Sequence, residues 1–167
     1  PNVERAKTLF DQEAQRLEVL GKHRQIPTLL DYVNEEHGQY LIQEFVHGYN
    51  LSQDLAMNGA WSESQIRYLL QQMLRLLHFV HQGNQIIHRD VKPENIIRKG
   101  SDLVLVDFGA SKLVSETTLG KTGTMIGSAA YTAPEQVRGK ATFASDLYSL
   151  AVTCIHLMTQ VPPFDLF

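Results

Sequence analysis

The chain has 167 residues, of which 43% are hydrophobic and 20% are charged, a composition that is typical of globular proteins and excludes wholesale disorder. Its 15 basic and 18 acidic side chains leave a net charge of -3, which gives no support to a nucleic-acid or anionic-membrane binder. No apolar run approaches the length of a membrane span, and the single Cys154 permits no intramolecular disulfide. The chain begins at Pro1 without a starting Met or a signal-peptide pattern, and we expect a cytoplasmic protein.

Residues 1–46 predict a helix followed by a hairpin. Apolar residues recur at helical spacing over the first 20 residues, and Gly21 supplies a stop. The segments TLLDYV and QYLIQEFV are rich in aliphatic and aromatic residues and are separated by the polar stretch NEEHG. This pattern predicts two antiparallel strands within residues 28–46.

The next segments predict helices. LSQDLAMNG indicates one or two helical turns that end at Gly59. A longer helix is expected to begin with the capping box of Ser62 and Gln65 and to end at Gly83. Its apolar stripe is expected to comprise Ile66, Leu69, Leu70, Met73, Leu74, Leu77 and Val80.

Residues 84–109 alternate between strand-like and loop-like segments, and residues 110–135 form a long surface segment rich in Gly, Ser and Thr. A final helix is expected to begin near Ser145 and Asp146. It is apolar nearly all round, so we expect it to be buried on every side. Its stripe is expected to comprise Leu147, Leu150, Ala151, Cys154, Ile155 and Met158.

Three short motifs occur in order: HRDVKPEN at residues 88–95, DFG at 107–109 and APE at 133–135. Each triplet alone is a weak signal, but the ordered set at this spacing is specific. On these motifs the chain resembles the eukaryotic-type serine/threonine protein kinases, in a form like those found in bacteria. The resemblance implies a partial protein-kinase-like α+β fold. Residues 1–46 would be the helix and hairpin of the small lobe, and residues 47–167 the mainly helical first part of the large lobe.

The resemblance also implies a reaction, the Mg²⁺-dependent transfer of the ATP γ-phosphate to a protein Ser or Thr hydroxyl. Asp90 matches the residue that orients the hydroxyl and takes its proton, and Lys92 matches the cation that offsets charge on the transferred phosphate. Asn95 and Asp107 match the metal-binding positions, and their oxygens are the kind of ligand that Mg²⁺ prefers. Glu13 matches the helix glutamate that pairs with a strand lysine.

Further positions follow from the same resemblance. The adenine pocket would be formed by Gln43 at its back, by the backbone of Glu44, Phe45 and Val46, and by Ile97. A packed column would comprise Leu17, Leu29, His88 and Phe108, with Asp146 as its anchor.

Regulation is also implied by the resemblance. Thr124 lies eleven residues before Glu135, at the usual phosphorylation site of the family, and Arg89 would be the cation that receives the phosphate. Thr117, Thr118 and Thr122 are alternative sites. Ser128 stands where the class usually has Thr, and its hydroxyl would bond Asp90 and Lys92.

Two departures from the family pattern affect activity. The strand lysine is expected some twenty residues before Glu13, so neither it nor the glycine-rich loop falls within the 167 residues. We therefore expect the chain alone to be inactive. We also expect it to self-associate through an uncovered side of its last helix, which would comprise Leu147, Tyr148, Val152, Leu157 and Met158. A non-catalytic kinase-like binding or scaffold module is the alternative function. A small-molecule phosphotransferase is a third possibility, against which Lys92, Pro93 and the APE segment argue.

Two patterns that imitate other sites are rejected. His78 and His81 are three residues apart on the expected helix, but no further ligand cluster accompanies them, so we do not expect a metal there. GKT at residues 120–122 imitates the end of a P-loop, but Ser115 stands where that motif needs a glycine.

Overall fold

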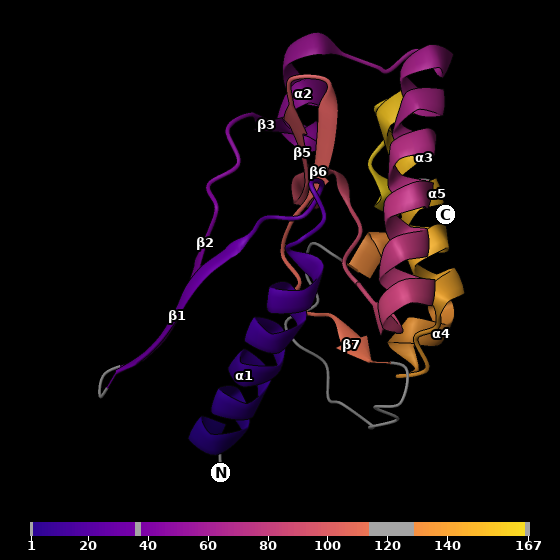
Figure 1. Cartoon of the computed structure of the whole chain (residues 1–167). Coiled ribbons are helices and arrows are strands. Elements are labelled where there is room, and N and C mark those ends of the chain that lie inside the picture. Colours follow the sequence, from indigo (N-terminus) through magenta and orange to yellow (C-terminus); the bar gives the residue numbers. More distant parts are fainter. Residues whose placement is uncertain (1, 36–37, 114–128, 166–167) are drawn as a thin grey trace.

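The structure is a computed structural model that describes residues 2–35, 38–113 and 129–165. Helix α1 (Asn2–Leu20) is followed by strands β1 (Leu29–Glu35) and β2 (Gly38–Gln43), which pair antiparallel. Figure 1 shows α1 and this hairpin on one side of the molecule, and the long helices α3 and α5 on the other. The predicted helix and hairpin are therefore confirmed.

Gly21 ends α1 for a steric reason. A Cβ at this position would lie 2.7 Å from the carbonyl oxygen of Leu17 and 3.0 Å from that of Pro27. Contacts this short with backbone atoms leave no room for any side chain, so the turn after α1 requires glycine.

Helices α2 (Leu51–Asn58) and α3 (Glu63–His78) both begin with capping boxes. In α3 the Gln65 backbone N–H donates to the Ser62 hydroxyl at 3.4 Å, and the Ser62 N–H donates to Gln65 Oε1 at 2.8 Å. The predicted start of α3 is thus confirmed. The helix continues as a π-helical turn over Phe79–Gly83, which agrees with the predicted end.

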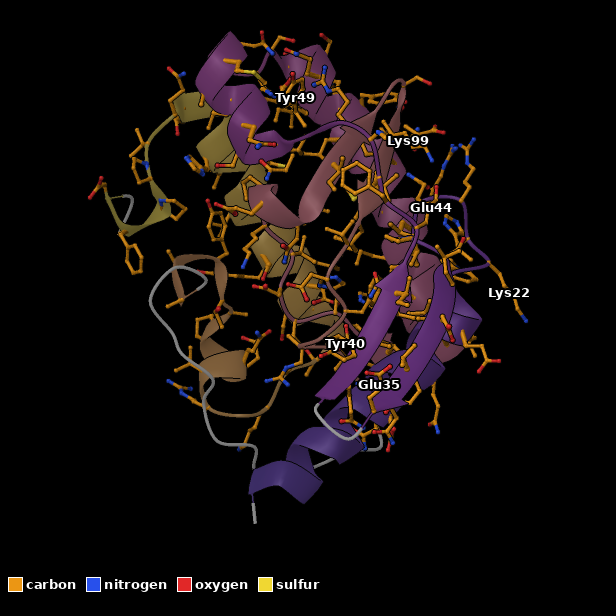
Figure 2. The ribbon with its side chains drawn as sticks, turned by 90° about the vertical axis from the view of Figure 1, so that its left-hand side faces the viewer. Lys22, Glu35, Tyr40, Glu44, Tyr49 and Lys99 are labelled. Carbon is orange, nitrogen blue, oxygen red and sulfur yellow. The ribbon has the colours of Figure 1, made fainter. Side chains whose placement is uncertain are left out.

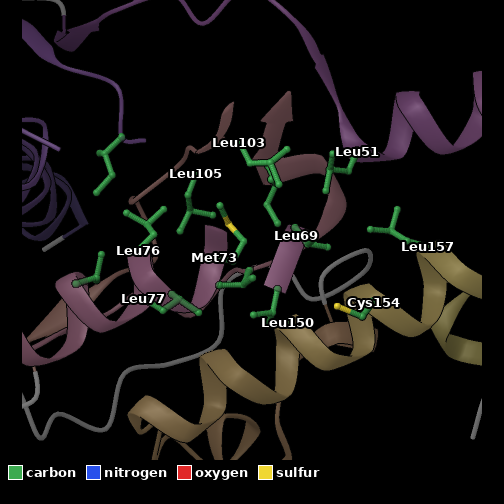
Figure 3. Packing of buried hydrophobic residues seen from close by; sticks show 14 of the residues in the cluster. Leu51, Leu69, Met73, Leu76, Leu77, Leu103, Leu105, Leu150, Cys154 and Leu157 are labelled. Carbon is green, nitrogen blue, oxygen red and sulfur yellow. The ribbon is translucent and has the colours of Figure 1, made fainter. Parts of the chain in front are cut away.

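The buried face of α3 differs from the predicted stripe at two positions. Leu74 is 46% exposed, although we expected it in the stripe, and Leu76 is fully buried, although we did not. Helix α3 packs against strand β6 (Asp102–Leu105) as well as against helix α5 (Phe143–Thr159), so its buried face is displaced from the simple stripe. In Figure 3, Leu76 faces the strand side of the core and Leu77 faces α5.

Two small sheets hold the loops between the helices. Strands β3 (Tyr49–Asn50), β5 (Ile96–Lys99) and β6 form one sheet in the order β3-β5-β6, and β4 (Ile86–Ile87) pairs with β7 (Lys112–Leu113) in the other. Strand β5 directly follows the motif at residues 88–95, and β6 ends at Leu105, just before the motif at residues 107–109. Short helical turns at Pro93–Asn95, Ala129–Tyr131, Pro134–Val137 and Pro163–Asp165 complete the described chain.

Helix α5 begins at Phe143 after the N-cap Thr142, two residues before the predicted start. The expectation that it is buried on every side is wrong. Leu150 and Cys154 are buried as predicted, but Leu147, Ile155 and Met158 are each more than 40% exposed. The buried side also carries the small polar residues Ser145, Ser149 and Thr153. Helix α3 and the turn at Ala129–Tyr131 pack on α5. No described helix is long and apolar enough to cross a membrane.

Candidate functional site

The loop at residues 88–95 is anchored to α5 by Asp146. This carboxylate is fully buried and accepts hydrogen bonds from the backbone N–H groups of His88 (2.8 Å) and Arg89 (2.7 Å). The Nε2 atom of His81 lies 2.7 Å from the same carboxylate. A buried charge is tolerated only when it is paired in this way, so Asp146 fixes the loop to the core. Arg89 adopts the left-handed conformation at φ 72°, and Gln136 donates to its carbonyl oxygen at 2.6 Å.

Three polar side chains meet on this loop. The Lys92 ammonium lies 2.8 Å from Asp90 Oδ2, and both side chains are 17% exposed. The Asn95 amide donates to the same Oδ2 atom and to the Asp90 carbonyl oxygen, each at 2.9 Å. Charge-assisted bonds of this length are strong and directional. Asp90 is therefore held in one orientation by Lys92 and Asn95.

Asp107 is brought to this group by the strand that precedes it. Strand β6 ends at Leu105, and the Val106 N–H donates to the Asn95 carbonyl oxygen at 2.9 Å. Asp107 follows in the left-handed conformation at φ 65°, with its side chain exposed, while Phe108 is fully buried. The turn thus presents a carboxylate to solvent one residue after the backbone bond to Asn95, and it places the next ring in the core.

Glu13 of α1 faces the same turn. A Cβ on Gly109 would lie 3.4 Å from Glu13 Oε2 and 3.3 Å from Asp107 Oδ1, so the glycine permits the two carboxylates to approach. Burial raises the pKa of the Glu13 carboxyl, the charge of Asp107 raises it further, and Arg16 partly offsets both effects. The buried Arg16 side chain donates to the Ser111 carbonyl oxygen at 2.5 Å, which ties α1 to residues 107–111.

The expected packed column is present in the core beneath these residues. Leu17, His88 and Phe108 are all buried, and the rings of His88 and Phe108 meet edge-on at 4.6 Å. Leu29 is partly buried against the same core, and Asp146 anchors the column through the His88 N–H. Burial lowers the pKa of the His88 imidazole, which is therefore neutral near pH 7. These residues link α1 and β1 with the loop at residues 88–95 through one core.

Residues 44–46, whose backbone is expected to border the adenine pocket, lie between β2 and β3. We call this segment the hinge. The Glu44 N–H donates to the Thr28 carbonyl oxygen at 2.8 Å, and the Glu44 carboxylate pairs with Lys99 at 2.8 Å (Figure 2). Phe45 is 76% exposed, whereas Val46 is buried. Among the hinge side chains, Val46 is thus the one directed inward.

The other expected pocket residues flank this segment. Gln43 is the last residue of β2 and is partly buried. Ile97 lies in β5, and a Cβ on Gly48 would come within 3.2 Å of its side chain. The structure therefore places Ile97 beside the chain that follows the hinge.

The oxygen donors of Asn95 and Asp107 fit Mg²⁺ better than a metal that needs an all-protein site. The described residues contain no group of three or more His, Cys, Asp or Glu side chains that could hold a metal ion. Mg²⁺ usually keeps several waters and binds one or two carboxylates together with substrate phosphates. A single exposed carboxylate beside an amide matches that requirement.

Two interactions of the structure were not predicted from the sequence, and five predicted residues lie outside the described part of the chain. Arg16 is three residues after Glu13 on α1, a spacing that could have indicated a shared helix face. The Lys99 pairing with Glu44 spans 55 residues and has no local signal. The predicted Thr117, Thr118, Thr122, Thr124 and Ser128 lie outside the described residues.

Comparison with known proteins agrees with these observations. Residues 2–166 match the family described as the protein kinase domain. The chain is 41% identical to serine/threonine-protein kinase B of Synechocystis sp., with 99% of this chain and 31% of that protein aligned. It is 41% identical to serine/threonine-protein kinase PknA of Nostoc sp. (94% and 29% aligned) and 35% identical to serine/threonine-protein kinase PrkC of Bacillus subtilis (93% and 24%). The chain therefore spans about a third or less of the relatives that it matches.

Proposed function

We propose a function from the premise that the chain belongs to the protein kinase domain family. The protein that contains the chain transfers the ATP γ-phosphate to a serine or threonine hydroxyl of another protein. The observation that carries this proposal is the convergence of Asp90, Lys92 and Asn95, with Asp107 beside them. Residues 1–46 would be part of the small lobe and residues 47–167 part of the large lobe.

The geometry supports a role for each residue. Asp90 orients the substrate hydroxyl and accepts its proton as the oxygen attacks the γ-phosphorus, while the bond from that phosphorus to the bridging oxygen breaks and ADP leaves. Lys92, which is already paired with Asp90, offsets the charge that develops on the transferred phosphate. Asn95 and Asp107 would hold Mg²⁺, which supplies charge neutralisation on the phosphates. Glu13 would pair with a lysine from a preceding strand, and such a cation would relieve the repulsion that Asp107 now exerts on Glu13.

The nucleotide base would lie between the hinge and β5. We propose that backbone groups of Glu44, Phe45 and Val46 bond the adenine, because the Phe45 side chain points to solvent. Ile97 would form the apolar floor and Gln43 the back of the pocket. The Glu44–Lys99 ion pair supports this arrangement, since it fixes the hinge against the β5–β6 hairpin.

Phosphorylation of Thr124 is proposed as the activating event, although Thr124 lies outside the described residues. Arg89 supports this proposal. Its Nε atom is buried without a hydrogen-bond partner in the described chain, and its Nη1 atom reaches the Ala110 carbonyl oxygen only at 3.4 Å. A phosphate would provide strong acceptors for this guanidinium.

The metal assignment is tested by Asp107→Asn in the full-length protein. We expect phosphotransfer to fall by at least about a hundredfold, since a charged ligand beside the phosphates is lost. Asp102→Asn is the matched control, because Asp102 begins the strand that precedes Asp107, and among the described residues its carboxylate pairs only with Arg24, at 3.7 Å. Activity is measured as transfer of labelled phosphate to a protein substrate.

Two outcomes would count against the proposal. Near-normal phosphotransfer by Asp107→Asn would contradict the metal role of this residue. If the unaltered full-length protein binds nucleotide but transfers no phosphate, the alternative of a non-catalytic kinase-like scaffold is favoured instead.

A further inference from the structure

A cleft of about 340 Å³ lies between the first turn of α3 and the turn that joins β5 to β6. Its floor is formed by the buried residues Trp61 and Leu103, its wall by Tyr68 and Arg98, and its rim by Ser64 and Ser101. Strand β5 leads away from Asn95 for four residues before this turn. At about 3.3 Å per residue, the turn is roughly 13 Å from the catalytic loop. The cleft is therefore separate from the proposed phosphotransfer site.

The guanidinium of Arg98 is held in place at the wall of this cleft. Its Nη2 atom lies 3.3 Å from the buried Asp54 carboxylate, and its central carbon lies 4.9 Å from the Trp61 ring centroid. Asp54 also accepts bonds from Trp61 Nε1 (2.8 Å) and Asn58 Nδ2 (3.0 Å). The Asp54 carboxylate, which also accepts bonds from Trp61 and Asn58, thus holds the Arg98 guanidinium at the wall of the cleft.

Most of the hydrogen-bonding capacity of Arg98 remains available. Arginine has five N–H donors, and the bond to Asp54 is the one that its side chain makes within the described part of the chain. The side chain is 37% exposed. An arginine in this state can donate two parallel bonds to an incoming carboxylate. The cleft therefore combines an apolar floor with a fixed cation at its edge.

We propose that this cleft binds a peptide segment in which a large apolar side chain lies next to an aspartate or glutamate. The apolar side chain enters against Leu103 and Tyr68, and the carboxylate bonds to Arg98. The exposed rim at Ser64 and Ser101 favours a peptide over a free small acid. Small ligands usually bury 70–90% of their surface, which this open rim does not permit, whereas a peptide can continue across it.

The ligand chemistry is tested by calorimetry on the full-length protein with three acetylated and amidated dipeptides: Phe-Asp, Phe-Asn and Ala-Asp. Phe-Asn has the shape of Phe-Asp without the charge, and Ala-Asp has the charge without the apolar body. We expect Phe-Asp to bind about tenfold more tightly than either of the others. Equal affinities for Phe-Asp and Phe-Asn, or no binding of Phe-Asp, would overturn the proposal. The measurement needs no catalysis, so its result is independent of the proposed phosphotransfer.

Two variants locate the binding. Ser101→Phe adds a ring at the exposed rim and should weaken Phe-Asp binding at least about tenfold while phosphotransfer stays unchanged. Arg98→Met keeps an apolar stem and should remove the preference for Phe-Asp over Phe-Asn. Gln82→Phe, at an exposed position near the other end of the α3 segment, is the control and should leave binding unchanged. Unchanged Phe-Asp binding in Ser101→Phe would overturn the assignment to this cleft, even if Arg98→Met fails to fold.

Discussion

Lys92 has two electrostatic effects at the residue scale. Its ammonium lies 2.8 Å from Asp90 Oδ2, so it orients the proposed base, and it adds positive charge where the phosphate would be transferred. Both effects act on the transition state more than on the bound nucleotide. The residue should therefore influence turnover more than nucleotide affinity.

We predict that Lys92→Met in the full-length protein lowers kcat by about a hundredfold and changes the KM for ATP little. Lys22→Met is the matched control, because Lys22 is an exposed lysine in the turn that follows α1. Steady-state phosphotransfer kinetics at varied ATP measure both constants. A loss confined to the KM for ATP would show that Lys92 binds nucleotide and does not assist transfer.

His88 should make stability depend on pH. Burial lowers its pKa in the folded state, and the charges of Asp146, Asp90 and Asp107 only partly offset this effect. The unfolded imidazole has a pKa of about 6.5, so the unfolded state binds more protons below that pH. The contribution of His88 to stability is therefore complete above about pH 6.5 and is lost as the pH falls toward the folded pKa.

We predict that the free energy of unfolding of the kinase domain falls as the pH is lowered from about 7.5 to 5.5, and that protonation of His88 in the unfolded state accounts for part of the decrease. His88→Phe keeps a buried ring without a titrating group, so its stability should depend less steeply on pH over this range. Urea denaturation of both proteins at each pH measures the difference. Identical pH dependence in the two proteins would exclude His88 as the source.

At the scale of one element, a capping box stabilises the start of α3. The hydroxyl of Ser62 accepts from the Gln65 N–H, and the Gln65 side chain accepts from the Ser62 N–H. This box satisfies backbone donors that the helix cannot pair by itself. Helix α3 carries much of the buried core, including Leu69, Met73 and Leu76, so its start affects the whole fold.

We predict that Ser62→Ala reduces the free energy of unfolding of the kinase domain by about 1 kcal/mol. Ser101→Ala, at an exposed turn position whose side chain caps no helix, should change it by no more than a few tenths. Urea denaturation compares the free energies of unfolding of the two variants, with the same dependence on urea concentration required of each. Equal stabilities would indicate that another donor–acceptor pair replaces the cap.

Local patterns could be predicted from the sequence, and non-local ones could not. The capping box of α3 and the stop at Gly21 depend on residues within a few positions of each other, and the hairpin depends on two adjacent apolar segments. The kinase motifs identified the family, because their residues and spacing are specific. In contrast, the burial of Leu76 and the exposure of Leu74 depend on which neighbours α3 packs against. The bond from Arg16 to Ser111 joins residues 95 positions apart, and no periodic pattern indicates it.

At the scale of the whole molecule, α5 has one side packed and one side uncovered. Leu147, Ala151, Ile155 and Met158 recur at helical spacing and are exposed in the described chain. An apolar stripe of this kind favours association with another surface. We expected Val152 and Leu157 in this uncovered set, but both are buried. The uncovered stripe is thus narrower than the sequence indicated.

We predict that the 167-residue chain, expressed by itself, self-associates through this stripe and shows no phosphotransfer activity. The double variant Leu147→Gln and Met158→Gln should shift it toward the monomer, whereas Val137→Gln, which alters an exposed apolar residue outside α5, should not. Sedimentation velocity over a range of concentrations measures the distribution. A chain that stays monomeric without any substitution would disprove the association, and one that phosphorylates a substrate would disprove the inactivity.

The anchoring of the catalytic loop by Asp146 also determines when that loop can form during protein synthesis. The bond from the His88 N–H to Asp146 spans 58 residues, and all the loop anchors on α5 emerge from the ribosome after the loop itself. At about 5–20 residues per second, the ribosome takes roughly 3–12 s to add those residues. During this interval the nascent loop lacks its buried carboxylate partner, so no bond from Asp146 holds the backbone of His88 and Arg89. A nascent chain that ends before residue 146 therefore lacks the anchor of the loop that carries Asp90.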